Sequence, residues 1–380
     1  MRVLLTSAPS TGHVAPLLGI GSALQKAGHD ICLATHPSQH KLARQAGLDA
    51  VAAGISEPEM VSERLLRWPD TKDQLPTQWA VRMFTQILAP SMLRDLLALM
   101  GAWRPDLLIH EEGEYAGPVA AAWRGIPWVT HGWGSPLRPM AELASLESDA
   151  APLWEGAQLE MPPAAGLYRF GLLNPCPVLL QADAPGAHTV WPIRPAYLRT
   201  PQTNHDTAGA TVPRRPAAYV GFGTVPHFAD APDEIRAAAA ALVRRGLSVV
   251  VTTPDDGLAR ELLAAHPDRV QVRRFVSLPD VLPHARVAVC HGGAGTVLAA
   301  LACGVALILL PRGTPSQLRM TDACTRAGVA HVATVANFDH VLESLLADES
   351  LRGRCADAAT ELAAMPSPAL VVSALENLAR

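Results

Sequence analysis

One glycine-rich turn constrains this chain more than any other segment. Cys290-His291-Gly292-Gly293-Ala294-Gly295-Thr296 follows the apolar run at residues 287–289 and precedes a helical pattern that reaches about Cys303. Glycines remove the Cβ atoms that would keep a ligand away from the backbone, and the free N–H groups of a first helical turn attract an anion. His291 and Thr296 add side-chain donors. The segment therefore predicts a strand, a turn and a helix that hold a diphosphate.

The composition narrows the classes of partner. The chain has 380 residues, of which 49% are hydrophobic and 17% are charged, with a formal net charge of −4. This length predicts two domains, or three at most, and the charge argues against nucleic acid as a partner and against an electrostatic membrane anchor. No apolar run reaches the ~20 residues of a membrane span, and the first residues resemble a strand more than a signal peptide. Six scattered cysteines predict free thiols, no structural zinc site and a cytoplasmic protein.

Strand and helix patterns alternate in the first half of the chain. Strand patterns cover residues 2–6, 30–35, 50–53, 106–110 and 127–131, and helical patterns cover residues 16–27, 42–47, 80–103 and 115–124. This order predicts a parallel sheet with helices on both faces. The pattern weakens over residues 132–171, where we expect loops and a broken helix at residues 139–159.

The alternation restarts after residues 201–215, whose turn-forming composition predicts a linker. Beyond it, strand patterns cover residues 217–221, 247–252, 270–272, 286–290, 306–310 and 330–332, and helical patterns cover 233–245, 258–265, 316–327 and 368–380. We expect an α/β chain with domains at residues 1–200 and 216–365 and a C-terminal segment at 366–380. Two such halves predict a ligand cleft at the carboxyl ends of their strands.

A histidine follows the first predicted strand. Thr11-Gly12-His13 should lie at the carboxyl end of the sheet, where reacting groups collect in α/β folds. Histidine accepts a proton near neutral pH, and a histidine base needs an acid that orients its other nitrogen. Glu111, Glu112 and Glu114 follow a strand of the same half and can supply that acid. The alternatives stay open: the histidine can cap or pack, and the glutamates can cap the next helix.

Further candidates lie in the second half. Gly221-Phe222-Gly223-Thr224 has a strand-to-turn position that predicts a second phosphate-facing loop. Phe275 can stack on a nucleobase or pack in a core. Gln317 can bind sugar hydroxyls, or it can belong to a helix start that Ser316 caps.

Aromatic residues gather in the less regular parts of the first half. Trp79, Phe84 and Trp133 are candidates for the wall of an apolar acceptor pocket. Core packing is the alternative for each of them.

The chain resembles family-1 glycosyltransferases of the GT-B fold over nearly its whole length, and four segments carry the resemblance. Within that family the chain is similar to the bacterial enzymes that attach deoxysugars to polyketides, macrolides and enediynes. The four segments are Gly12-His13-Val14-Ala15-Pro16-Leu17, the stretch from Trp103-Arg104-Pro105-Asp106 through Glu111 to Ala116-Gly117-Pro118, Gly221-Phe222-Gly223-Thr224, and His291-Gly292-Gly293-Ala294-Gly295-Thr296. The chain departs from the family where Phe275 replaces a Trp and where Ser316 replaces an Asp that commonly binds donor-sugar hydroxyls. The second departure favours a deoxysugar donor or a donor pocket with an altered preference.

The resemblance implies two Rossmann-like domains that face each other across a cleft. The N-terminal domain would hold the acceptor, the C-terminal domain would hold the nucleotide sugar, and the last helix would cross back to the N-terminal domain. His13 takes the place of the general base and Glu111 that of its acidic partner. The implied donor site consists of Gly12, Gly223, Thr224, Phe275, Val276, His291, Gly292, Gly293, Ala294, Gly295, Thr296, Ser316 and Gln317.

The implied reaction is an inverting transfer of a sugar or deoxysugar from a dTDP-sugar or UDP-sugar to a natural-product aglycone, with no metal and no cofactor. O-transfer is favoured, and C-transfer to a phenol-like acceptor is allowed. The partners are then the aglycone and the nucleotide sugar, and a homodimer stays open. Two rivals remain, namely a nucleotide-sugar-binding auxiliary protein without transfer activity and a sugar-nucleotide epimerase on the same fold.

Overall fold

The chain folds into two compact units in a computed structural model that describes residues 1–74, 79–181, 189–196, 218–223 and 231–380. The first unit contains residues 1–176, 181–196 and 365–380, and the second contains residues 177–180 and 197–364. The last 16 residues (365–380) therefore belong to the same unit as the N-terminus. The expected linker at residues 201–215 lies outside the described residues, and so do the expected domain ends at residues 200 and 216.

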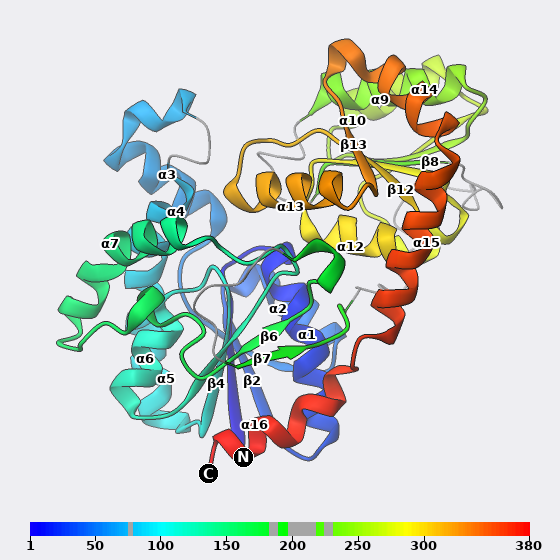
Figure 1. The fold of residues 1–380 in the computed structure, drawn as a ribbon. Coiled ribbons are helices and arrows are strands. Elements are labelled where there is room, and N and C mark those ends of the chain that lie inside the picture. The colour runs from blue at the N-terminus through cyan, green and yellow to red at the C-terminus, as the bar shows by residue number, and fades with distance from the viewer. Residues whose placement is uncertain (75–78, 182–188, 197–217, 224–230) are drawn as a thin grey trace. The chain divides into compact units, whose positions relative to one another are not determined.

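The first unit is built on a parallel sheet of seven strands within the described residues, in the order β3-β2-β1-β4-β5-β6-β7 (Figure 1). Its strands are β1 (Arg2–Thr6), β2 (Asp30–Thr35), β3 (Asp49–Ala52), β4 (Leu107–Glu111), β5 (Trp128–His131), β6 (Leu172–Asn174) and β7 (Val190–Pro192). Val3, Leu4 and Leu5 in the middle of β1 are fully buried, because helices cover both faces of a parallel sheet.

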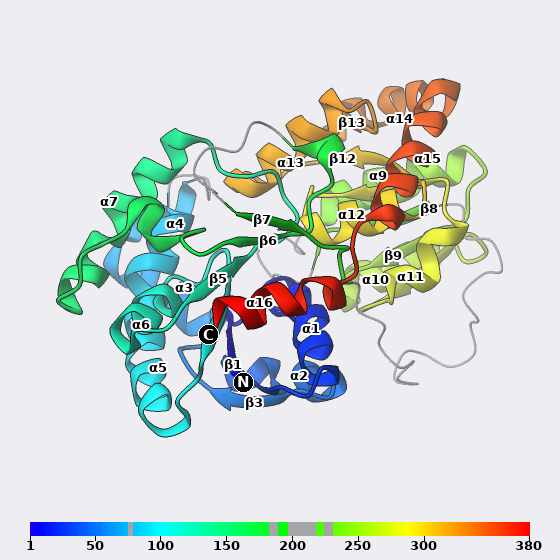
Figure 2. The same ribbon diagram turned by 60° about the horizontal axis from the view of Figure 1, so that its bottom comes forward.

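Helices surround this sheet. They are α1 (Thr11–Lys26), α2 (His40–Gln45), α3 (Glu57–Arg67), α4 (Ala80–Met83), the π-helix η4 (Phe84–Leu88), α5 (Ala89–Trp103), α6 (Ala116–Arg124), α7 (Met140–Gly156), η9 (Pro368–Val371) and α16 (Val372–Leu378), with the short 3₁₀ turns η1 (Pro37–Gln39), η2 (Pro69–Asp73) and η5 (Pro163–Gly166). The C-terminal helix α16 lies close to α1 (Figure 2), and Glu376 Oε1 lies 2.9 Å from His29 Nε2. The C-terminal segment is thus held against the first unit.

The first helix differs from its predicted boundary. It begins at Thr11 and not at Pro16, because Ser10 is extended (φ −131°) and serves as the N-cap, while Pro16 is accommodated inside the helix. His13 therefore lies in the first helical turn and not in a preceding loop.

The secondary structure predicted for the first unit was incomplete in four other places. The predicted helix at residues 80–103 is divided by the π-helix η4, and the predicted broken helix at 139–159 is the single helix α7 with Pro152 inside it. Helix α3 was missed, although Ser56 and Glu59 form a capping box whose sequence spacing is a recognised helix-start signal. The strands β6 and β7 were missed because three-residue strands carry too little hydrophobic pattern to stand out.

The second unit repeats the same architecture with six strands in its described part, in the order β10-β9-β8-β11-β12-β13, all parallel. Its strands are β8 (Ala218–Gly221), β9 (Val249–Thr252), β10 (Val270–Arg273), β11 (Val287–Cys290), β12 (Ala306–Leu309) and β13 (Ala330–Val332). Its helices are α9 (Pro232–Arg244), α10 (Asp256–Ala265), α11 (Leu278–Val281), α12 (Ala294–Ala302), α13 (Pro315–Arg326), α14 (Phe338–Ala347) and α15 (Glu349–Ala364), with the 3₁₀ turns η6 (Val178–Leu180), η7 (Leu282–His284) and η8 (Val335–Asn337).

Each sheet has one point where the direction of strand succession reverses. In the first sheet this point lies between β1 and β4, and in the second it lies between β8 and β11. The loops that leave two such neighbouring strands diverge to opposite faces and leave a crevice at the carboxyl ends. His13 and Glu111 follow the first pair of strands, while Gly223 and His291 follow the second pair.

Two further features concern the chain as a whole. The six cysteines all lie in the described residues and carry free thiols. Over the described residues, no single helix is long and apolar enough to cross a membrane, and the pair formed by Glu349–Ala364 and Pro368–Leu378 passes this test only jointly, across a bend of 46°.

Candidate active site

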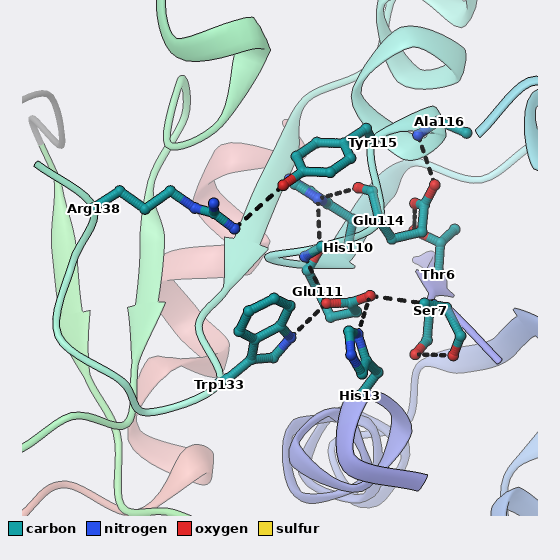
Figure 3. Close-up of polar contacts among 12 residues, drawn as sticks. Thr6, Ser7, His13, His110, Glu111, Glu114, Tyr115, Ala116, Trp133 and Arg138 are labelled. Carbon is teal, nitrogen blue, oxygen red and sulfur yellow. Dashed lines mark hydrogen bonds and ion pairs between the residues drawn. The ribbon is translucent and has the colours of Figure 1, made fainter. Parts of the chain in front are cut away.

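A histidine and a glutamate meet at the switch point of the first sheet (Figure 3). His13 Nδ1 lies 2.9 Å from Glu111 Oε1, and their side chains are 18% and 0% exposed. An ionised carboxylate only accepts hydrogen bonds, so Nδ1 carries the proton and Nε2 is left as a proton acceptor. Helix α1 supplies the histidine and β4 supplies the glutamate, which fixes both ends of the pair on regular structure.

Glu111 is held by four donors. Oε1 accepts from His13 and from the backbone N–H of Ala8 at 3.2 Å, and Oε2 accepts from the backbone N–H of Gly113 at 2.6 Å and from Trp133 Nε1 at 2.5 Å. A buried carboxylate is costly unless its oxygens are satisfied, and here each oxygen has two donors. The carboxylate is therefore fixed in position and stabilised in its charged form.

The pKa values of the two groups move apart. Burial opposes protonation of His13, but the charge of Glu111 and the hydrogen bond to it outweigh burial, so the histidine pKa is raised above its usual value. Burial acts to raise the pKa of Glu111, but the charge of His13 and the hydrogen bonds from His13, Gly113 and Ala8 hold that pKa below its usual value. Glu111 is thus the charged partner that makes His13 a stronger base.

Two aromatic rings flank the imidazole of His13. The Phe84 ring lies 5.4 Å from it at a tilt of 32°, and the Trp133 ring lies 4.8 Å from it, edge-on at 66°. Phe84 is the first residue of the π-helix η4, a rare element that is frequently found at functional sites. A half-buried carboxylate, Glu57 at the start of α3, also acts on the charge of His13. Sequence reasoning missed Glu57, because α3 itself was missed.

The three glutamates after β4 have three different functions. Glu111 faces His13, whereas Glu114 accepts from the backbone N–H groups of Ala116 and Gly117 and so caps α6. Burial, together with the charge of Glu111, raises the pKa of Glu114 to about 7. Glu112 forms a buried ion pair with Arg138 at 3.2 Å. The sequence left open whether these glutamates contact His13 or cap the next helix, and the structure shows one glutamate in each of these contacts.

Two other buried histidines belong to the scaffold of the sheet. His110 lies on β4 and His131 on β5, and burial lowers the pKa of each to about 4, so both are neutral at physiological pH. The Nδ1 atom of His110 lies 2.9 Å from the carbonyl oxygen of Glu114, and its Nε2 atom lies 2.9 Å from Thr130 Oγ1. These contacts tie the loop that carries the glutamates to the neighbouring strand.

The third aromatic candidate of the first unit lies in a core. Trp79 is 8% exposed and packs with Met60, Met83 and other apolar residues, and the guanidinium of Arg64 lies 4.0 Å from its ring centroid. Of the three aromatic candidates, Phe84 and Trp133 lie against His13, and Trp79 does not share that contact.

The glycine-rich turn of the second unit has the predicted strand, turn and helix. It joins β11 to α12, and Gly292 has a φ of +86°, a conformation that glycine adopts without strain. Thr296 and Val297 both donate to the carbonyl oxygen of Gly293, so the N–H groups of Ala294 and Gly295 precede the first intrahelical bond. These N–H groups form the helix end that favours an anion.

His291 lies under this turn as a neutral side chain. It is 7% exposed, and burial followed by the charge of Arg312 lowers its pKa to about 4. A Cβ atom on Gly293 would lie 2.6 Å from His291 Nε2, and one on Gly223 would lie 2.8 Å from His291 Cε1. The two glycines are therefore required for the ring to pack between the loops after β8 and β11.

The remaining donor candidates are only partly located. Phe275 is 41% exposed, so the alternative that it packs in a core is wrong, and Val276 is half-buried beside it. Thr224 lies outside the described residues. Gln317 is buried, and its Oε1 accepts from the backbone N–H of Arg312 at 2.8 Å.

Ser316 does not cap helix α13. The N-cap is Thr314, whose Oγ1 accepts from the backbone N–H of Gln317 at 3.3 Å. Ser316 lies inside the first turn, half-buried, with its hydroxyl 3.3 Å from that of Thr314. Proline is favoured at the first helical position, so α13 begins at Pro315 and the residue before it is the cap.

Within the described ranges, no group of three or more His, Cys, Asp or Glu side chains could hold a metal ion.

Family models match the chain from residue 22 to residue 378. The N-terminal domain model of the Erythromycin biosynthesis protein CIII-like family matches residues 22–238, and its C-terminal domain model matches residues 236–378. The chain belongs to this family. It is a natural-product glycosyltransferase of family 1, as the resemblance of its four segments implied. This membership favours a glycosyltransferase over the epimerase and over the binding protein without transfer activity.

Two relatives of this glycosyltransferase match over almost their whole length. L-demethylnoviosyl transferase of Streptomyces niveus is 31% identical over 385 residues, which cover 99% of this chain and 97% of the relative. Aclacinomycin-T 2-deoxy-L-fucose transferase of Streptomyces galilaeus is 26% identical over 440 residues, covering 100% of this chain and 96% of the relative.

Solved structures support the fold. SnogD from Streptomyces nogalater has a TM-score of 0.76 at 24% identity, with 100% of this chain and 99% of that chain covered. The spinosyn rhamnosyltransferase SpnG complexed with thymidine diphosphate has a TM-score of 0.77 at 24% identity, with 99% and 100% covered. The predicted α/β class, GT-B with two Rossmann-like domains, is confirmed.

Proposed function

We propose that this glycosyltransferase moves a deoxysugar from a dTDP-sugar or UDP-sugar to a hydroxyl group of a natural-product aglycone, with inversion and without a metal. The observation that carries the proposal is the His13–Glu111 pair. His13 Nδ1 lies 2.9 Å from the buried carboxylate of Glu111, which leaves His13 Nε2 to act as the base. An acceptor hydroxyl needs such a base, because its oxygen must lose a proton as it attacks.

The proposed chemistry proceeds in one displacement. Nε2 of His13 takes the proton of the acceptor hydroxyl, and the oxygen forms a bond to the anomeric carbon as the bond to the nucleoside diphosphate breaks. Glu111 stabilises the imidazolium that forms. A phenol-like acceptor could instead react through a ring carbon with the same base, so O-transfer is the favoured form of the proposal and C-transfer is allowed.

The leaving diphosphate is assigned to the N-terminus of α12. In the turn Gly292-Gly293-Ala294-Gly295, exposure rises from the buried Gly292 to the exposed Gly295, and His291 and Thr296 border it. Hydrogen-bond donors and a helix dipole in fixed positions stabilise charge as it develops on a leaving group. We assign Phe275 and Val276 to the nucleobase of the donor. The rest of the donor is assigned to Gly12, Gly223, Thr224, Ser316 and Gln317.

The names of the relatives support the class of substrates. The Streptomyces galilaeus relative is named a 2-deoxy-L-fucose transferase, and a Saccharopolyspora erythraea relative is named a desosaminyl transferase. SpnG and the glycosyltransferase VinC were solved with thymidine diphosphate. We therefore place dTDP-deoxysugars first among the donors to be assayed.

Two measurements test the proposal together. Melting of the wild-type protein is followed with dTDP, UDP, GDP and NAD, since a ligand at 100 times its Kd stabilises by about 2.7 kcal/mol. Transfer is then followed by mass spectrometry with aromatic polyketide and macrolide aglycones. Stabilisation by dTDP or UDP together with a product one sugar heavier supports the proposal, whereas no stabilisation by any diphosphate contradicts it.

The variant His13→Ala tests the assignment of the base. We expect kcat to fall by ~10²–10⁴ while binding of the nucleoside diphosphate is unchanged. Turnover equal to that of the wild-type protein would refute the assignment.

A further inference from the structure

Trp133 contacts both members of the His13–Glu111 pair. It follows β5, its Nε1 atom lies 2.5 Å from Glu111 Oε2, and its ring lies edge-on to the His13 ring at 4.8 Å (Figure 3). Phe84, by comparison, contacts only the histidine ring of the pair. One side chain thus reaches the acid and the base at once.

The hydrogen bonds of Glu111 show what Trp133 adds. Of the four donors to this carboxylate, two are backbone N–H groups that the turns after β1 and β4 fix. The other two are the side chains of His13 and Trp133. The charge of His13 changes when its Nε2 takes up a proton during the reaction, whereas the indole N–H of Trp133 donates to Glu111 without any change of charge.

The indole is itself held in place. A Cβ atom on Gly113 would lie 2.6 Å from Trp133 Cζ2, so the absence of a side chain there makes room for the ring. The guanidinium of Arg138 lies 5.9 Å from the ring centroid, and its ion pair with Glu112 keeps it there. The ring is therefore packed on one side by the backbone and bordered by a fixed cation.

We propose that Trp133 is a positioning residue of the catalytic pair. Its indole N–H keeps Glu111 ionised and turned toward His13, and its ring fixes the plane of the imidazole. This inference rests on the proposed function, and it assigns Trp133 a task other than lining the acceptor pocket. A wall residue would affect the binding of the acceptor, whereas a positioning residue affects the rate of transfer and the titration of the pair.

The first experiment compares Trp133→Phe with Trp128→Phe. Both variants keep an aromatic ring and lose one indole hydrogen bond, but Trp128 donates to the carbonyl oxygen of Gly166 at 2.8 Å, away from the pair. Because Trp133→Phe removes a hydrogen bond to a charged group, we expect kcat to fall by roughly 10- to 100-fold, with little change in KM for the acceptor. Trp128→Phe should leave kcat unchanged. A rise in KM with kcat unchanged in Trp133→Phe would overturn the inference.

The same substitution is then made in the His13→Ala background. Because Trp133 acts through the pair, its loss should have no further effect on the residual rate there. An additional loss of equal size in that background would overturn the inference.

A third readout does not depend on transfer. The titration of Glu111 is followed by NMR with a carboxyl ¹³C label, and Trp133→Phe should raise the pKa of this group, because a donor to the charged form has been removed. Trp133→Leu, which also lacks the indole N–H, should raise the pKa in the same direction and replaces Trp133→Phe if that variant fails to fold. An unchanged pKa in a folded variant would overturn the inference. If instead the pKa rises but the wild-type protein transfers no sugar, the proposed function fails and the positioning of Glu111 stands.

Discussion

The variant Gly295→Ala adds one methyl group to helix α12 and should change donor binding and protein stability in opposite directions. Gly295 is the second residue of α12, it is exposed, and a Cβ atom built on it meets no heavy atom within 4 Å. Gly295→Ala therefore causes no clash within the protein. Because Cα–Cβ bonds tilt toward the N-terminus of a helix, the new methyl group lies where the diphosphate is proposed to approach.

The expected magnitudes have opposite signs. Alanine in place of an exposed helical glycine raises the free energy of unfolding by up to about 1 kcal/mol. A methyl group that keeps a phosphate from the first-turn N–H groups should weaken donor binding by at least about tenfold, or about 1.4 kcal/mol. The protein should thus become slightly more stable and bind its donor less well.

Gly353→Ala is the matched control. Gly353 is exposed on α15 of the same unit, and a Cβ atom there also meets nothing within 4 Å. Melting temperature and the Kd of dTDP and UDP are measured for both variants by calorimetry. We expect both to melt no lower than the wild-type protein and only Gly295→Ala to bind weakly. Equal Kd values in the two variants would refute the placement of the diphosphate on α12.

Two further predictions concern protonation. The pKa of His13 is raised, chiefly by Glu111 against the effect of burial. Because the base must be neutral to act, kcat/KM should be lost as pH falls through that raised pKa. A pH profile of kcat/KM checks this, and an acidic limb that persists unchanged in His13→Ala would contradict it. The charge of Glu57 also raises the pKa of His13, so Glu57→Gln should move the acidic limb to lower pH. Glu59→Gln, on the exposed side of the same helical turn, is the control and should leave the limb in place, and a shift of equal size in both variants would argue against a specific contribution from Glu57.

Local sequence signals sufficed for the elements that carry the site. The apolar runs of β1, β4, β8 and β11 and the glycines that follow β11 are local patterns, because a parallel strand is buried on both faces and a diphosphate turn needs residues without Cβ atoms. The family resemblance depended on the same segments. It therefore identified the fold and the class of enzyme without knowledge of any long-range contact.

The boundaries and the short elements were harder to predict. Helix α1 was predicted to begin at Pro16, but it begins five residues earlier and Pro16 lies inside it. Helix α13 was predicted to begin at Ser316, but it begins at Pro315, because proline is favoured at the first helical position. The π-helix η4 begins at Phe84, which packs against His13, and follows Met83, which lies in a small core, and no periodic signal marks it in the sequence.

Local patterns and the family resemblance were enough to predict an α/β glycosyltransferase with a histidine and a group of glutamates after neighbouring strands. Which glutamate faces His13 could be read only from the three-dimensional contacts, because Glu111, Glu112 and Glu114 are chemically identical and nearly adjacent. Each of them has a partner distant in the chain: His13 for Glu111, Arg138 for Glu112 and Thr6 for Glu114. Trp133 reached the pair in the same way, since a hydrogen bond between residues 22 positions apart is set by how strands β4 and β5 pair in the sheet.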